Sequence, residues 1–211
     1  LAESVSVSDD GLVFTYKLRP NIKFHNGRQL TADDIIWSYT RIAAMKPDSP
    51  QLRYIKSIKG VDAVNEGKDK TISGFKKIDD LTFEMTLEDP VDIKYYLWLP
   101  GMAIVPKEEV ERLGDAFTTN PVGCGPFKFV KWVKGSEVVM EKFADFYLEG
   151  KPYLDKIVYK TMDQAAPRDL AFKAKELDVT LVGAVNYPEY KADPEISKNM
   201  IEVAEMFTRL V

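Results

Sequence analysis

The feature that most constrains the fold is a set of short segments in which apolar and polar residues alternate on both sides of a tight turn. In the clearest case the turn is Asp79-Asp80, and the apolar residues are Ile72, Phe75 and Ile78 before it and Leu81, Phe83, Met85 and Leu87 after it. A period of two places alternate side chains on one face of a β-strand. Two such runs joined by a short polar turn predict an antiparallel hairpin.

The same pattern predicts two further hairpins. One joins residues 5–7 to Val13–Leu18 across Ser8-Asp9-Asp10-Gly11, and the other joins Pro126–Val133 to Glu137–Phe143 across Lys134-Gly135-Ser136. Isolated apolar runs predict short strands at residues 22–24, 104–105, 156–160 and 177–181. We therefore expect most strand pairs to be hairpins that join segments adjacent in the sequence.

Helical segments lie between these strands. The best one begins at Thr31, a hydroxyl N-cap, with Asp33 and Asp34 in the first turn, where carboxylates favour the helix dipole. Weaker helices are expected at residues 51–58, 91–99, 107–113 and 166–175, and the last thirty residues contain two proline breaks and no closing signal. Helices mixed with hairpin-paired strands predict an α+β fold. The segment NPVGCG, Asn120–Gly125, is the main break and the candidate domain boundary.

Composition excludes several classes of protein. Lys and Arg total 29 against 33 Asp and Glu, which gives a net charge of −4 without a concentrated basic stretch, so nucleic acid is not an expected partner. The single cysteine, Cys124, excludes an internal disulfide and any zinc site built on several thiolates. No apolar run approaches the length of about 18 residues that a membrane span needs. The chain begins with what we interpret as mid-domain sequence rather than a signal peptide.

The sequence shows no set of residues that could form a catalytic site. His25 is the only histidine, so no Ser-His-Asp or Cys-His arrangement can form without it, and its place in the turn Phe24–Gly27 favours a side chain that bonds its own backbone. Cys124 lies between two glycines before a predicted strand, where a small packed residue is expected rather than a catalytic thiol. Asp33 and Asp34 are explained by helix capping. We therefore expect no catalytic residues, no metal site and no cofactor.

Aromatic residues are the other side chains that could serve a function. By default we expect them in the core, although tryptophan and tyrosine also line ligand clefts. They are Trp37, Tyr95, Tyr96, Trp98 and Trp132.

Three groups of segments carry a resemblance to a known family. The first holds FTYKLRP (14–20), IKFHNG (22–27), LTADDI (30–35) and Ser38-Tyr39; the second NPVGCGPF (120–127), Phe146-Tyr147 and GKPYLDKI (150–157); the third Arg168 and ELDV (176–179). In this order and spacing they closely resemble the signature of extracellular solute-binding family 5, the peptide-, dipeptide- and nickel-binding receptors of ABC importers. Two departures are visible, since the family usually has Thr at the position of Cys124 and Gly at that of Lys175.

The resemblance implies a fold and a domain plan. The fold would be the periplasmic-binding-protein-like fold of class II type, peptide-binding subgroup, present only in part. Residues 1–118 would be mostly the small outer domain, 119–182 part of the first, hinge-bearing lobe, and 183–211 the start of the ligand-closing lobe. Members of the family are much longer than 211 residues, so a third lobe would lie beyond this sequence.

The resemblance also implies a mechanism and a site. Two lobes would close around the ligand because it binds the closed form more tightly. The positions that match cleft-lining segments are Gln51, Tyr54, Leu181, Val182, Gly183 and Ala184. The structural alternatives are packing on the adjacent helix for Tyr54 and a simple chain reversal for Gly183.

The function expected on this basis is the binding component of an ABC importer, which captures an oligopeptide or similar small solute in the periplasm and delivers it to a membrane permease. We expect a monomer that is not an enzyme. The alternatives are a hydrolase whose active groups lie outside this sequence, and a signalling receptor or chaperone that uses the same fold. Peptides, nickel complexes, opines and sugars all stay open as ligands.

Overall fold

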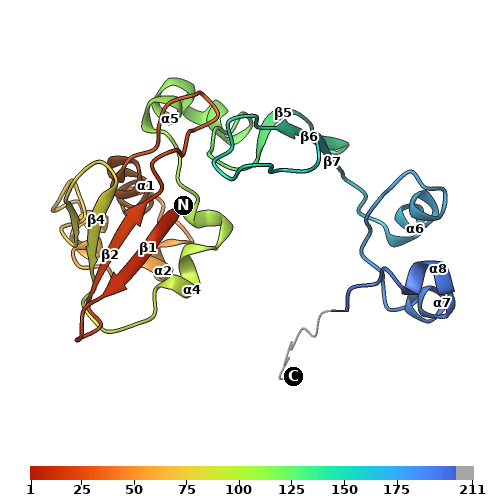
Figure 1. Cartoon of the computed structure of the whole chain (residues 1–211), viewed down its shortest axis with the longest axis horizontal. Coiled ribbons are helices and arrows are strands. Elements are labelled where there is room, and N and C mark those ends of the chain that lie inside the picture. The colour runs from red at the N-terminus through yellow and green to blue at the C-terminus, as the bar shows by residue number, and fades with distance from the viewer. Residues whose placement is uncertain (203–211) are drawn as a thin grey trace. The chain divides into compact units, whose positions relative to one another are not determined.

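The computed structural model describes residues 1–202 and divides the chain into two compact units (Figure 1). The larger unit is Leu1–Tyr159 and the smaller is Lys160–Val211. The division does not test the predicted assignment of residues 1–118, 119–182 and 183–211 to receptor domains, which stays a prediction. Within the predicted segment 183–211, residues 203–211 lie outside the described residues.

A four-stranded antiparallel sheet forms the centre of the larger unit. Its strands are β1 (Ala2–Val7), β2 (Val13–Leu18), β3 (Phe75–Lys77) and β4 (Thr82–Thr86), in the order β1-β2-β4-β3. Both predicted hairpins are confirmed. The central pairing of β2 with β4 joins them, with Tyr16 opposite Phe83.

The core lies between this sheet and helix α1 (Ala32–Ala44), which runs beside it (Figure 1). Alternate residues of β2 and β4 are buried, and α1 adds Ile35, Tyr39 and Ile42 at helical spacing. Two pairs of stacked aromatic rings fill the centre of this core. The ring centroids of Tyr16 and Phe83 are 5.1 Å apart, and those of Tyr39 and Phe75 are 5.8 Å apart.

Helix α1 begins as the sequence predicted. The backbone N–H of Thr31 donates to the Asp34 carboxylate at 2.9 Å, and Asp33 is also in the first turn. Asp34 has a second function that the sequence did not reveal. It is buried, and Arg28 donates to its two oxygens at 2.6 and 3.0 Å, while the same guanidinium reaches both oxygens of Glu108 at 2.6 and 3.0 Å. Arg28 thereby ties the loop before α1 to helix α5 (Lys107–Leu113).

Short helices complete this part of the unit. They are α2 (Leu52–Ile55), α3 (Val61–Asn65), α4 (Lys94–Leu97) and α5, with the 3₁₀ turns η1 (Pro100–Met102) and η2 (Gly114–Thr118). The predicted helix 51–58 ends early because Ile58 is drawn into an antiparallel bridge with Leu87. The predicted strand 104–105 is wrong, since the backbone N–H and C=O of Val105 bond the Ser38 hydroxyl at 3.2 and 3.3 Å in place of a neighbouring strand. Residues 22–24 form only one bridge, from Lys23 to Gln29.

A second, three-stranded sheet follows in the order β5-β6-β7. The strands β5 (Phe127–Val133) and β6 (Glu137–Lys142) form the third predicted hairpin, and β7 (Lys156–Lys160) was also predicted. Large apolar side chains stay exposed on it, among them Val130, Trp132 and Tyr159.

The smaller unit is helical within residues 160–202. It contains α6 (Ala165–Lys173), which was predicted, and α7 (Tyr187–Ala192) and α8 (Pro194–Ser197), which were not. Tyr190 is buried between them, where its ring lies 5.9 Å from that of Phe172 and its hydroxyl bonds Asp169. The predicted strand 177–181 is wrong. Its alternating apolar residues Val179 and Leu181 are exposed, so the pattern has no buried face to support pairing. No helix among residues 1–202 is long and apolar enough to cross a membrane.

Candidate functional site

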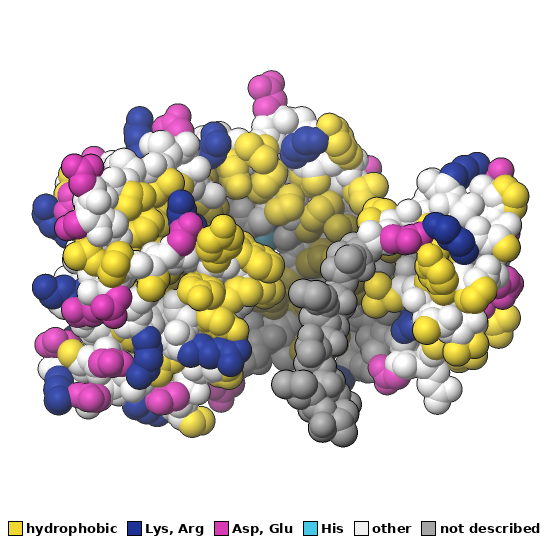
Figure 2. Space-filling view, turned by 90° about the horizontal axis from the view of Figure 1, so that it is seen from below, with side chains coloured by type: hydrophobic (Ala, Val, Ile, Leu, Met, Phe, Trp, Pro, Cys, Tyr) yellow, Lys and Arg dark blue, Asp and Glu magenta, His cyan; other side chains and the backbone are white. Residues whose placement is uncertain are grey.

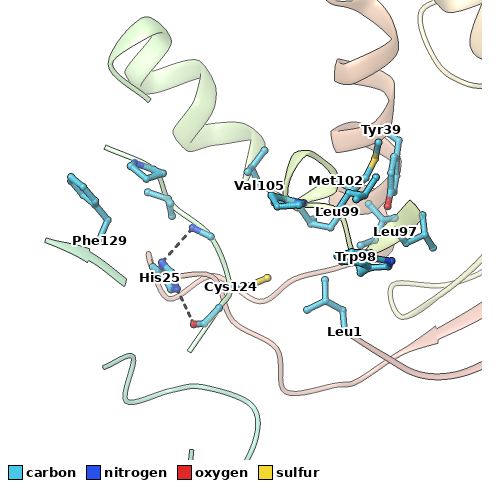
Figure 3. Close-up of a pocket in the computed structure, with 18 of the residues that line it drawn as sticks. Leu1, His25, Tyr39, Leu97, Trp98, Leu99, Met102, Val105, Cys124 and Phe129 are labelled. Carbon is cyan, nitrogen blue, oxygen red and sulfur yellow. Dashed lines mark hydrogen bonds between the residues drawn. The ribbon is translucent and has the colours of Figure 1, made fainter. Parts of the chain in front are cut away.

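An apolar pocket of about 760 Å³ lies within the larger unit (Figure 3). Three parts of the chain build its wall: the central sheet with α1 and the loop before α1, residues 97–105, and residues 118–140, which lead into and include the β5–β6 hairpin. Leu97, Trp98 and Met102 come from the second part, and Cys124 and Phe129 from the third. The volume is that of an ordinary small-molecule site.

The pocket lining carries no Lys, Arg, Asp or Glu side chain. Its titratable side chains are His25, Cys124 and two tyrosines. Burial raises the pKa of Cys124 to about 11, so the thiol is protonated near neutral pH and is a poor nucleophile. Burial also raises the pKa of Tyr16 to about 12, and the Tyr16 hydroxyl has no hydrogen-bond partner in the described part of the chain. The pocket is therefore suited to holding an uncharged group rather than to proton transfer.

His25 fixes the wall of the pocket to the core. Its backbone N–H donates to the Gly123 carbonyl at 2.7 Å, its Nδ1 accepts the Gly123 N–H at 3.3 Å, and its Nε2 lies 3.0 Å from the Gly125 carbonyl (Figure 3). This pattern requires a neutral imidazole with the proton on Nε2. The expectation that His25 bonds the backbone of its own turn is wrong, because its partners lie about a hundred residues away. Its role is structural all the same.

Exposed aromatic side chains lie at and near the pocket, and two of them, Trp98 and Trp132, line it and form its aromatic rim. Trp98 is 73% exposed and Tyr95 71%, and Tyr96 and Trp132 are exposed too, whereas Trp37 is half-buried. The expectation that these residues form the core is therefore wrong. For Tyr95, Tyr96 and Trp98 the physical reason is that α4 is only four residues long and has no buried position. Trp132 lies on β5, none of whose residues is buried. Figure 2 shows large hydrophobic patches on one face of the larger unit, with acidic and basic side chains interspersed around them. Large exposed apolar patches typically mark binding surfaces.

Gln51 and Tyr54 contact the segment that carries this rim. The Tyr54 ring packs on that of Tyr96 with centroids 5.3 Å apart, and the Gln51 side chain crosses Gly101 so closely that a Cβ there would lie 2.3 Å from Gln51 Cδ. Neither residue lines the apolar pocket itself. The Tyr54 ring also lies under the Arg53 guanidinium, 4.6 Å from the ring centroid. Both residues thus support the aromatic segment, and their contact with a ligand stays a prediction.

The other predicted site residues lie in the smaller unit. Leu181 and Ala184 are exposed, and Val182 and Gly183 are half-buried. The Gly183 carbonyl accepts the backbone N–H groups of Asn186 and Tyr187, both at 3.0 Å, and so leads the chain into α7. That is the geometry of a chain reversal, which was the structural alternative. Whether these four residues also bind a ligand stays a prediction.

Most of the pocket lining was missed from the sequence. The signals available were the apolar run around Trp98 and the segment NPVGCGPF, which the sequence analysis interprets as a domain boundary and a family motif but not as part of a pocket wall. Within residues 1–202, no three His, Cys, Asp or Glu side chains come close enough together to hold a metal ion.

Comparison with known proteins decides the family. Residues 1–210 match the family described as "Bacterial extracellular solute-binding proteins, family 5 Middle". This chain belongs to solute-binding family 5. The resemblance read from the sequence motifs is confirmed, and a family of solute-binding proteins rather than of enzymes agrees with the lack of reaction machinery in the motifs.

Curated family 5 relatives are similar over most of this chain. The periplasmic oligopeptide-binding protein OppA of Salmonella typhimurium is 32% identical over 177 residues, which is 81% of this chain and 33% of OppA. The glutathione-binding protein GsiB of Pectobacterium atrosepticum is 32% identical over 161 residues, which is 76% of this chain and 29% of GsiB. The chain thus spans about a third of the length of the curated relatives it matches.

Solved structures of family 5 confirm the α+β periplasmic-binding fold. A periplasmic oligopeptide-binding protein of Borrelia burgdorferi superposes with a TM-score of 0.83 at 30% identity, covering 92% of this chain and 40% of that one. The binding protein AgaA of A. tumefaciens R10, solved in complex with agropinic acid, superposes with a TM-score of 0.78 at 32% identity, covering 92% of this chain and 37% of AgaA.

Proposed function

We propose that this chain is part of the substrate-binding component of an ABC importer, a receptor that captures an oligopeptide or similar small solute and delivers it to a membrane permease. The observation that carries the proposal is the charge-free pocket with an exposed aromatic rim in a chain of family 5. Such a surface binds solutes by burying apolar area and by stacking, neither of which needs a reactive group.

The class of ligand is inferred from the relatives. Their names describe binding of oligopeptides, of di- and tripeptides and of glutathione, all of which carry peptide bonds. A peptide presents apolar side chains that suit the pocket and backbone groups that hydrogen-bond without regard to side-chain identity. We therefore favour a short peptide over a metal complex or a sugar.

The proposed binding event is a closure of two lobes. Tyr54, whose ring packs at a tilt on that of Tyr96, and Gln51, packed against Gly101, would hold one edge of the cleft. Leu181, Val182, Gly183 and Ala184 would lie at the crossover to the closing lobe. The ligand stabilises the closed form by its greater affinity for that form.

We place the receptor in the periplasm, as a monomer that meets its permease in the closed form. The relatives named as periplasmic support this location. Neither a hydrolase nor a signalling receptor has a specific observation in its favour.

A thermal-shift screen of the whole protein that contains this chain tests the proposal. A ligand that binds only the native state raises the melting temperature by mass action, by an amount that grows with ligand concentration. We expect a set of di- to pentapeptides to include such ligands. A screen in which peptides have no effect, while another solute class raises the melting temperature, would contradict the peptide assignment but not the binding function.

A further inference from the structure

A second hollow, of about 590 Å³, lies on the surface along α1. We call it the α1 groove. Its lining includes the apolar side chains of Ile36, Trp37 and Met45, which we call its floor, and the cationic side chains of Arg41, Lys70 and Lys107. All of these residues lie in the larger unit, and none of them lines the apolar pocket.

The fold explains only part of the apolar floor of the α1 groove: Ile36 packs against the core, whereas Trp37 and Met45 are not among the residues packed on it. The core face of α1 presents Ile35, Tyr39 and Ile42, which are buried. Trp37 and Arg41 are four residues apart and therefore share another face of the helix. Trp37 is only half-buried there, and Met45 at the end of the helix is exposed. Trp37 and Met45 therefore leave apolar surface accessible to solvent in this hollow.

Within the described residues, the charges of the groove that lack a close ion-pair partner are all positive. Its only acid is Asp33, which Lys77 already neutralises at 2.6 Å. Lys107 has one loose, exposed partner, Glu111, at 3.7 Å. Among residues 1–202, Arg41 and Lys70 have no ion pair. In a chain with a net charge of −4, this hollow is locally cationic.

We infer that the α1 groove docks an acidic segment of a partner protein, with an apolar side chain of that segment on Trp37 and Met45 and its carboxylates on Arg41 and Lys70. An arginine can bind a carboxylate through two parallel hydrogen bonds, and opposite charge speeds and orients the encounter. The groove is concave, which suits a peptide segment better than a flat anionic membrane surface. Three cations in a single hollow are too few to track a nucleic acid backbone.

The test is a titration of the whole protein with a fluorescein-labelled peptide of alternating Glu and Leu, read by fluorescence anisotropy at low and at moderate salt. We expect saturable binding that weakens as salt rises, since screening reduces the attraction between exposed charges. The double variant Arg41→Glu/Lys70→Glu is expected to bind at least about tenfold more weakly, the loss of about 1.4 kcal/mol that two weakened charge contacts would give. Its affinity for the transported solute should not change.

The matched control is Lys59→Glu/Lys134→Glu, which makes the same change of charge at two exposed lysines outside the groove. Melting temperatures establish that both variants fold. Equal weakening by the groove and control variants would overturn the proposal, because only net charge would then matter. The proposal would also fail if the acidic peptide does not bind while vesicles of anionic lipid do so through Arg41 and Lys70. A Lys-Leu peptide that binds as well as the Glu-Leu peptide would contradict it too.

Discussion

His25 and Gly123, 98 residues apart in the sequence, are joined by two hydrogen bonds: the His25 N–H donates to the Gly123 carbonyl at 2.7 Å, and the Gly123 N–H donates to His25 Nδ1 at 3.3 Å. A third contact joins His25 Nε2 to the Gly125 carbonyl at 3.0 Å. The segment that leads into the second sheet is thereby held against the loop before α1. The only histidine of the chain sets the position of one wall of the pocket.

Replacing His25 by alanine should destabilise the protein, because two side-chain hydrogen bonds to backbone groups are lost. We expect the free energy of unfolding to fall by about 1–3 kcal/mol, measured by urea titration at pH 7.5. The backbone bond from His25 to Gly123 is kept in the variant. An unchanged unfolding midpoint would show that the imidazole does not hold the segment.

The same histidine makes stability depend on pH. Burial, above all, holds the pKa of His25 below its ordinary value of 6.5. The unfolded chain then binds the proton more readily than the native protein, so this contribution is complete above pH 6.5 and is lost as pH falls from 6.5 toward the lower, native pKa. Unfolding titrations between pH 7.5 and pH 5 should therefore show a steeper loss of stability in the wild type than in His25→Ala. Parallel pH profiles would contradict this.

Asp33 and Asp34 are adjacent in the sequence but should differ strongly on mutation. The Asp34 side chain is 6% exposed and holds Arg28 by two hydrogen bonds, whereas that of Asp33 is 67% exposed. Asp34→Asn removes the buried charge that pairs with Arg28 and leaves Glu108 as its one carboxylate partner, so it should cost about 1–3 kcal/mol, which allows for the partial exposure of Arg28. Asp33→Asn, the matched control, should cost much less because exposed ion pairs contribute little. Thermal unfolding of the two variants distinguishes them. Equal losses of stability would refute the claim that the buried pair of Asp34 with Arg28 stabilises the fold.

Lys175 occupies a backbone conformation that favours glycine. Its φ is +62°, and it is the one non-glycine residue within residues 1–202 with a positive φ. The resemblance to family 5 had indicated glycine at this position. Because a side chain is strained there, Lys175→Gly should stabilise the native state by up to about 1 kcal/mol. Lys173→Gly, in the last turn of α6, is the opposite control and should destabilise. A melting temperature lowered by Lys175→Gly would contradict the explanation.

Trp98 should matter for binding and hardly for stability. It is 73% exposed and lines the pocket, whereas Tyr95 is 71% exposed on the same helical segment and does not line it. Trp98→Ala in the whole receptor should weaken ligand binding roughly tenfold or more, as loss of an aromatic contact in a binding site commonly does. Tyr95→Ala should leave the affinity unchanged. If both variants bind the ligand as the wild type does, the aromatic rim is not part of the site.

The hairpins were predictable because the information for each is local. Alternation on both sides of a turn specifies β1–β2, β3–β4 and β5–β6 without knowledge of the rest of the chain. The pairing of β2 with β4 was not predictable in this way, since Tyr16 and Phe83 are separated in the sequence by helices α1, α2 and α3. The sequence analysis does not predict α7 and α8 because it treats Pro188 and Pro194 as breaks, although proline is favoured in the first turn of a helix. Asp193, which accepts two backbone N–H groups of α8, was the overlooked signal.

The site was harder to predict than the fold. We expected the aromatic residues near Trp98 in the core. An apolar run in a sequence does not show whether its side chains point into the core or toward solvent. Only the four-residue length of α4, which the sequence does not show, leaves them exposed. His25 was recognised as structural, but its partners at residues 123 and 125 depend on long-range folding.

Calorimetric titration of the whole protein with a peptide found in the thermal-shift screen, followed by recovery of that peptide, tests the central claim most directly. The account predicts saturable binding at one site and a peptide recovered chemically unchanged, because the pocket lining carries no activated nucleophile and no acid–base pair. Cleavage or modification of the peptide at a rate above that of the buffer would contradict it.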